Sequence, residues 1–225
     1  MSVVSETIDW LTDSVNHSGT DGIPHRLVEH LGYTAETIAI AGVIAIPVGL
    51  WIGHTGRFRG SAVALTGALR ALPTLGLLTA LALFVGIGLT APLIALVVLA
   101  VPPLLAGAYA GVESVDRQTI DAARAMGMTE LQILRKVEIP LALPIIVGGI
   151  RSAVLQVVAT ATVAAFVGLG GLGRYLIDGQ AVSDYAQMAG GSVLVIAMAL
   201  VLDGVFATLQ ALATGRQPRK QPSPA

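Results

Sequence analysis

The sequence predicts an all-α protein: a polytopic membrane helical bundle with five core transmembrane helices and short helices in one cytoplasmic loop. The 225-residue chain is 54% hydrophobic and only 12% charged, whereas a soluble domain has about 25% charged residues. Its uncharged runs approach or exceed the roughly 20 residues that a helix needs to cross a bilayer core. One segment between two such runs, residues 121–144, carries six charges and favours helix.

The five spans follow from runs that lack Asp, Glu, Lys and Arg. The first run covers residues 37–53. The second covers residues 71–112, enough for two helices separated by "GIGLTAP" at residues 86–92. Glycine and proline punctuate helices, so that stretch is the expected turn. Two later runs are each interrupted by a single charge, Arg151 or Asp203. The expected spans are residues 36–54, 62–86, 91–111, 142–166 and 189–212.

Basic residues set the predicted orientation, because loops rich in Lys and Arg stay in the cytoplasm. The loops on one side of the spans hold nine Lys and Arg residues, and those on the other side hold two. Five spans then place the N-terminus outside and the C-terminus inside. We expect an extracytoplasmic segment at 1–35, a transmembrane domain at 36–212 with a cytoplasmic loop at 113–140, and a polar, Pro-rich, disordered cytoplasmic tail at 213–225.

Composition excludes several classes of function. A net charge of −1 offers no basic surface for nucleic acid, and the absence of cysteine excludes disulfides and Cys-ligated metal. The first basic residue is Arg26 and no apolar run precedes it, so no signal peptide is expected. His25 and Glu29 are spaced for one helix face, but scattered histidines on a surface helix are far commoner than a metal site. No bound metal is therefore expected.

The charged loop predicts two short helices joined at a glycine. Asp116 is a favourable N-cap, and Gly127 stands where a left-handed C-terminal cap is wanted. Thr129 and Gln132 have the spacing of a capping box, which begins a second helix. Pro140 is expected to end that helix, because the residue before a proline avoids the helical region.

The resulting elbow carries an apolar stripe that includes Ile120 and Ala123 at near-helical spacing. This small chain has nothing obvious to cover the stripe. We therefore expect the elbow to fit into a groove on another protein.

The loop resembles the "EAA" loop of binding-protein-dependent ABC importer permeases. The match consists of Asp121-Ala122-Ala123, then Gly127, then "VEIP" ending at Pro140. Asp replaces the usual first Glu of the family, and Val replaces a usual Ile. Residues 70–116 and 159–179 resemble the osmoprotectant branch, which imports glycine betaine, carnitine or choline. The resemblance covers about residues 34–212.

The resemblance implies a transmembrane permease subunit of an ATP-driven importer for such an osmoprotectant. Its loop would dock as coupling helices onto a cytoplasmic ABC ATPase dimer, and an extracytoplasmic substrate-binding protein would deliver the solute. A second permease, identical or different, would complete the pathway across a bacterial cytoplasmic membrane. The implied loop residues are Asp121, Ala122, Ala123, Met126, Gly127 and Pro140.

The chain itself is not expected to be an enzyme. A phosphate-binding loop ends in Gly-Lys-Ser/Thr, and neither of its two lysines, Lys136 and Lys220, follows a glycine. No catalytic residue or bound cofactor is therefore expected, and the partner ATPase would use ATP and Mg.

Three alternatives stay open beside an osmoprotectant permease. The first is an ABC permease for another small solute such as an amino acid. The second is an ion-coupled secondary transporter or channel, which expects membrane-embedded acids or inverted repeats and finds only Asp203. The third, an intramembrane enzyme, would need a catalytic pair at depth that the sequence does not display.

The path of a solute can be assigned only in outline. Quaternary ammonium groups are usually held in aromatic cages, and a chain with 4% aromatic residues is not expected to build one. A transient polar path could instead use Pro73, Thr74, Thr79, Thr160 and Thr162. Threonines also serve ordinary packing between membrane helices.

Two further features of the sequence each have two interpretations. Arg151 and Asp203 either form an ion pair that tethers the fifth span or snorkel separately to the interface. The glycine-rich residues 168–179 are expected to bend the chain at the outer mouth. There they either contact the binding protein or form a plain flexible turn.

Overall fold

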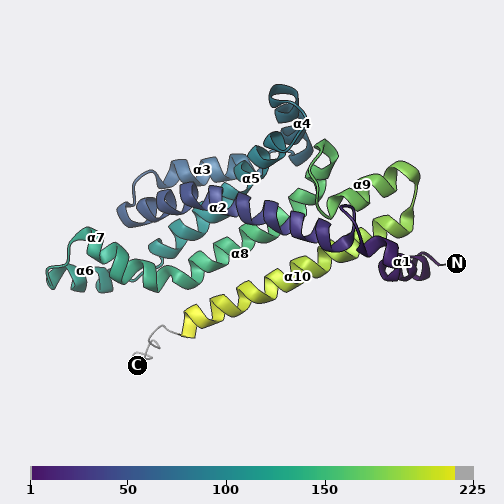
Figure 1. The fold of residues 1–225 in the computed structure, drawn as a ribbon. Coiled ribbons are helices and arrows are strands. Elements are labelled where there is room, and N and C mark those ends of the chain that lie inside the picture. The colour runs from purple at the N-terminus through teal and green to yellow at the C-terminus, as the bar shows by residue number, and fades with distance from the viewer. Residues whose placement is uncertain (1, 216–225) are drawn as a thin grey trace.

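The computed structural model describes residues 2–215, and every regular element in that range is helical (Figure 1). The predicted all-α class is therefore confirmed. Residues 213–215 of the expected tail belong to the last helix, and residues 216–225 lie outside the described residues. The elements are α1 (Val3–Thr12), η1 (Ser14–His17), α2 (Ile23–Thr55), α3 (Arg59–Arg70), α4 (Thr74–Val85), α5 (Thr90–Glu113), α6 (Arg117–Ala125), α7 (Glu130–Ile133), η2 (Leu134–Glu138), α8 (Ile139–Ala164), η3 (Ala165–Val167), α9 (Gly173–Val182) and α10 (Tyr185–Gly215).

Four long helices and one broken pair occupy the five predicted spans. The long helices are α2, α5, α10 and a continuous helix formed by α7, η2, α8 and η3 over residues 130–167. α6 and α7 lie at one end of the bundle, and α1 and α9 lie at the other (Figure 1). α2 begins at Ile23 and has 33 residues. At 1.5 Å per residue it is about 50 Å long, so it exceeds a hydrocarbon core of about 30 Å.

The second predicted span, residues 62–86, is not one helix. α3 and α4 meet at 86° across a short break, and Pro73 is the N-cap of α4 with extended backbone angles. Proline donates no backbone hydrogen bond and turns the preceding residue away from helix. Pro73 therefore separates two short helices here, where one span over residues 62–86 was expected.

The prediction that Pro140 ends the second loop helix is wrong. The helix passes through this proline and continues into α8. η2 is a π-helical turn, in which the N–H of Ile139 donates to the carbonyl of Leu134. A π turn lets a membrane helix accommodate proline, because it redistributes the backbone hydrogen bonds around the ring. The charged loop thus ends as the first turns of the fourth span.

α5 is the central helix, and its neighbours approach it closely at small residues. A Cβ atom built on Gly107 of α5 would lie 2.6 Å from the Cα of Gly149 in α8. A Cβ atom on Gly49 of α2 would lie 2.7 Å from the carbonyl oxygen of Leu105 in α5. Apolar side chains gain little by leaving lipid for protein, so membrane helices associate through such close packing.

We expect Gly107→Ala to destabilise the bundle. The added methyl group would collide with the backbone of α8 and force two helices apart, at a cost of about 1–3 kcal/mol. Gly204→Ala is the matched control, because a Cβ atom at Gly204 of α10 meets nothing within 4 Å. Thermal unfolding in detergent should show a lower midpoint for Gly107→Ala and no loss for the control. Equal midpoints would contradict the close approach of α5 and α8.

Candidate functional site

The elbow between α5 and α8 is built by the local signals that the sequence carries. Asp116 Oδ1 accepts a hydrogen bond from the N–H of Gln118 at 2.9 Å, and Gly127 is left-handed with φ 81°. Thr129 and Gln132 form the complete capping box, with each side chain bonded to the backbone N–H of the other residue. The predicted cap, corner and second cap are all confirmed.

The apolar stripe of the elbow is covered within the chain, which corrects the expectation that it lies open. Ile120 and Ala123 pack with Val115 and Ile133 in a small core. Ala123 is only 2% exposed. Met126, by contrast, is 75% exposed at the corner. The remaining loop residues singled out from the sequence, Asp121, Ala122, Gly127 and Pro140, are also exposed.

A chain of ionic contacts runs across the elbow. Arg124 Nε contacts Glu130 Oε1 at 2.8 Å, and its Nη1 contacts Asp121 Oδ1 at 3.2 Å. The hydrogen bond to Glu130 is the main reason that the pKa of Arg124 is raised. Glu130 is in turn 3.3 Å from the Nε2 atom of His54, at the end of α2.

His54 also contacts Glu138, with 2.5 Å between Nδ1 and Oε2. Sequence reasoning named Glu138 only as part of the loop motif and missed both His54 and the contact between the two residues. The available signal was an acid, Glu138, placed directly before an apolar span. Its histidine partner is 84 residues away along the chain and has no sequence signature.

A cavity of about 200 Å³ adjoins these contacts and is lined by both His54 and Glu138. Arg59 of α3 contacts Glu113 of α5 at 2.5 Å in its wall. The guanidinium carbon of Arg59 also lies 6.0 Å from the ring centre of Tyr109. The cavity therefore has a mixed, largely paired charge.

The residues proposed for a solute path do not form one polar cluster. Thr160 Oγ1 donates to the carbonyl of Gln156 at 2.7 Å, and Thr162 Oγ1 donates to that of Val158 at 3.2 Å. Both hydroxyls thus bond within their own helix. Pro73 and Thr74 lie at the break before α4. Thr79 lines a separate hollow of about 370 Å³ together with Ile87 and Phe166.

Arg151 of α8 and Asp203 of α10 are brought together. Arg151 Nε lies 2.6 Å from Asp203 Oδ1, and its Nη2 lies 2.7 Å from Oδ2. This two-pronged geometry is the strongest form of a guanidinium–carboxylate contact. Its role as a tether for the last span stays a prediction.

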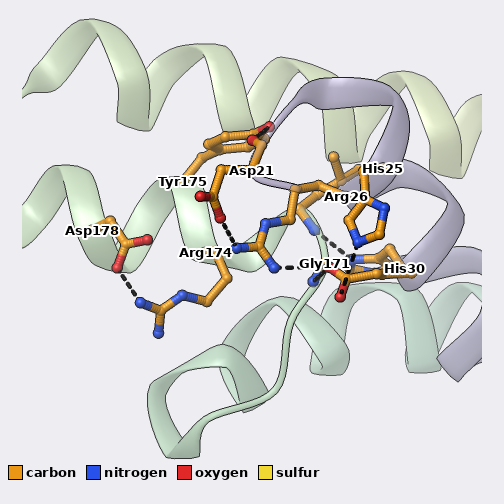
Figure 2. A network of polar contacts seen from close by, with 10 residues as sticks. Asp21, His25, Arg26, His30, Gly171, Arg174, Tyr175 and Asp178 are labelled. Atoms are coloured by element: carbon orange, nitrogen blue, oxygen red, sulfur yellow. Dashed lines mark hydrogen bonds and ion pairs between the residues drawn. The ribbon is translucent and has the colours of Figure 1, made fainter. Parts of the chain in front are cut away.

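At the other end of the bundle, polar contacts pin the glycine-rich corner to α2 (Figure 2). The Nε2 atom of His30 lies 3.1 Å from the carbonyl oxygen of Val158, and the N–H of Leu172 donates to its Nδ1 atom at 3.3 Å. These two bonds define one neutral tautomer, with the proton on Nε2. Glu29 Oε2 accepts from the N–H of Gly171 at 3.0 Å. The corner is therefore tied down at two successive amides.

The N-terminal segment is tied to α9 at the same end. Tyr175 donates from its hydroxyl to the carbonyl of Asp21 at 2.6 Å, and burial raises the pKa of Tyr175 to about 12. Trp10 packs edge-on against the Tyr175 ring, with 5.0 Å between centroids. Arg26 contacts Asp21, and Arg174 contacts Asp178 (Figure 2). This end of the bundle thus has a polar network of its own, separate from the contacts around His54 at the elbow.

Long apolar helices around α5, with a hydrophilic elbow between two of them, define a multi-pass membrane protein. The chain belongs to the family described as "Binding-protein-dependent transport system inner membrane component", whose sequence model matches residues 45–216.

Characterised relatives cover most of the chain. It is 31% identical over 199 residues to the carnitine transport permease protein OpuCD of Listeria monocytogenes, covering 87% of this chain and 89% of that protein. It is 31% identical over 186 residues to the glycine betaine/carnitine/choline transport system permease protein OpuCB of Bacillus subtilis, covering 83% and 86%. The osmoprotectant import permease protein OsmW of Salmonella typhimurium is 30% identical over 217 residues, covering 93% and 97%.

Solved structures share the fold. A chain of the MetNI methionine ABC transporter in an inward-facing conformation matches with a TM-score of 0.74 and 25% identity, over 83% of this chain and 93% of that chain. A chain of an amino acid ABC transporter matches with a TM-score of 0.62 and 22% identity, over 85% and 92%. The arrangement of helices is thus that of ABC transporter permeases.

We expect His30→Leu to destabilise the protein. The buried N–H of Leu172 loses its acceptor, and an unsatisfied buried group costs about 1–3 kcal/mol. His25→Leu is the matched control. The His25 side chain is half-exposed, and its contact with Glu29 is long, at 3.7 Å. Thermal unfolding should separate the two variants. A normal midpoint for His30→Leu would contradict the buried bridge.

Proposed function

We propose that this chain is the transmembrane permease subunit of an ATP-driven importer for a small osmoprotectant such as glycine betaine, choline or carnitine. The observation that carries the proposal is the capped elbow of residues 113–140, with its exposed corner, in a chain of the binding-protein-dependent family. The solute class is supported by relatives of about 30% identity that carry osmoprotectant names and match along most of their length.

In this proposal the elbow docks onto a cytoplasmic ATPase. Asp121, Ala122, Met126 and Gly127 form the docking face, and Ala123 supports it from inside. Pro140 lies where the elbow enters the fourth span. The chain hydrolyses no ATP itself, and the ATPase dimer uses ATP and Mg.

The orientation follows from charge and placement. The chain lies in a bacterial cytoplasmic membrane and crosses it several times. The turn from α2 to α3 lies at the same end of the bundle as α6 and α7 (Figure 1). The described basic residues of these loops are Arg57, Arg59, Arg117, Arg124, Arg135 and Lys136. We assign that end to the cytoplasm. The N-terminal segment 1–35 then faces out, residues 36–212 form the transmembrane domain, and the tail 213–225 lies inside.

Two further partners complete the importer. A second permease, either an identical copy or a sister subunit, forms the other half of the pathway. An extracytoplasmic binding protein supplies the selectivity, because this subunit has few aromatic residues for a cation cage. Pro73, Thr74, Thr160 and Thr162 are the proposed low-affinity lining.

The ion-coupled alternative has less support. Such transporters need an acid that is free to bind and release the coupling ion. The acid in the last span, Asp203, is held in a two-pronged contact with Arg151. An amino acid as the solute is favoured by no contact in this chain.

We expect ATP-dependent uptake of glycine betaine, choline or carnitine when the chain is reconstituted in proteoliposomes with its ATPase and binding protein. Gly127→Val should abolish this uptake while leaving membrane insertion intact. The left-handed corner costs a branched residue about 1–3 kcal/mol and re-aims the docking face. Gly127→Asn is the control, since asparagine tolerates this conformation. Uptake driven by an ion gradient without ATPase would contradict the proposal.

We also expect a cysteine at Met126 to capture the ATPase with a thiol-to-amine cross-linker. The parent chain has no cysteine, so the thiol-reactive end of the reagent attaches to this chain only at the introduced site. Ala123→Cys should react poorly, because that position is buried. Equal capture from both positions, or capture from neither, would count against the assigned docking face.

A further inference from the structure

His54 of α2 contacts both halves of the second loop helix. Its Nδ1 atom lies 2.5 Å from Glu138 Oε2 in η2, and its Nε2 atom lies 3.3 Å from Glu130 Oε2 in α7. The last turn of α2 is thereby joined to the elbow. Nothing in the sequence pattern or in the family match assigns this residue a role.

The position of Glu138 explains why a partner is needed. Glu138 is the last residue of the π turn and is only 2% exposed. A buried carboxylate is costly unless a hydrogen-bonded partner compensates it. The π turn that accommodates Pro140 therefore also places the side chain of Glu138 in the protein interior, where it contacts His54.

The geometry of the imidazole makes it a bridge. Its Nδ1 atom is hydrogen-bonded to Glu138 of η2, and its Nε2 atom faces the Glu130 carboxylate of α7, so each ring nitrogen meets an acid from a different half of the helix. The contacts then continue through Glu130 to Arg124, and through Arg124 to Asp121 in α6. One connected series of polar side chains thus joins the end of the first span to the docking face.

We infer that His54 is a positioning residue for the coupling elbow. It holds α7 and η2 against the end of α2, so that the first span moves together with the elbow. This inference rests on the proposed function, because it assumes that the elbow receives the movement of an ATPase. His54 itself contacts neither solute nor nucleotide.

The test uses the complete importer with four variants. His54→Leu removes both contacts, and His54→Gln keeps one donor. His54→Leu combined with Glu138→Leu also removes the uncompensated buried acid. Arg59→Gln is the matched control. It breaks the ion pair between Arg59 of α3 and Glu113 of α5, which lies in the wall of the same cavity and does not involve the elbow.

Four quantities are measured for each variant: co-purification with the ATPase, the thermal midpoint, the stimulation of ATPase activity by solute-loaded binding protein, and cross-linking from a cysteine at Met126. In His54→Leu we expect the complex to form, while stimulation and cross-linking fall about five-fold or more. His54→Gln should be intermediate, and Arg59→Gln should resemble the parent.

The double variant separates positioning from stability. Its midpoint should return to within about 2 °C of the parent, because no unpaired buried acid remains. Its stimulation should stay low, because leucine cannot bridge to Glu130. This comparison also decides the matter if His54→Leu alone fails to fold.

Three results would overturn the inference alone: normal stimulation in His54→Leu, recovery of stimulation together with stability in the double variant, or an equal loss in Arg59→Gln. A parent chain that never binds an ATPase would overturn the proposed function first, and this inference with it. The two failures are therefore distinguishable.

Discussion

The close approach of α5 to its neighbours is the constraint on which the rest of the structure depends. Gly107 and Gly149 bring α5 and α8 almost backbone to backbone, and Gly49 does the same between α2 and α5. Lipid surrounds these helices with groups as apolar as their own side chains, so close packing takes the place of the hydrophobic drive of soluble cores. The ends of the packed helices then fix where polar contacts can form.

Those polar contacts gather at opposite ends of α2 and involve a histidine at each. His30 bonds to α8 and to the glycine corner that follows it. His54 contacts Glu130 and Glu138 in the turns that precede α8. The first and fourth spans are therefore joined at both ends by polar contacts, and both pack closely against α5 at glycines. A rigid pair of helices of this kind can carry movement from one side of the membrane to the other.

Much of the fold and of the elbow could be predicted from the sequence, because the signals for them are local. Uncharged runs predicted the spans. Asp116, Gly127 and Thr129 predicted the elbow, because helix caps depend on contacts over only three or four residues. The predictions at two prolines were wrong. Pro73 separates two helices where one span was expected, and Pro140 lies within a helix that it was expected to end, directly after a π turn. Which outcome occurs depends on how the surrounding backbone rearranges its hydrogen bonds. Contacts between distant residues, such as His54 with Glu138, leave no periodic trace at all.

The right-angled break between α3 and α4 restricts what can surround it. Backbone outside a helix cannot face hydrocarbon, because its amide groups would find no partner there. Residues 71–73 are exposed on the single chain, and Pro73 offers α4 no side-chain cap. The break must therefore sit at the headgroup level or beside water or another polypeptide. This part of the surface is therefore unsuited to acyl chains.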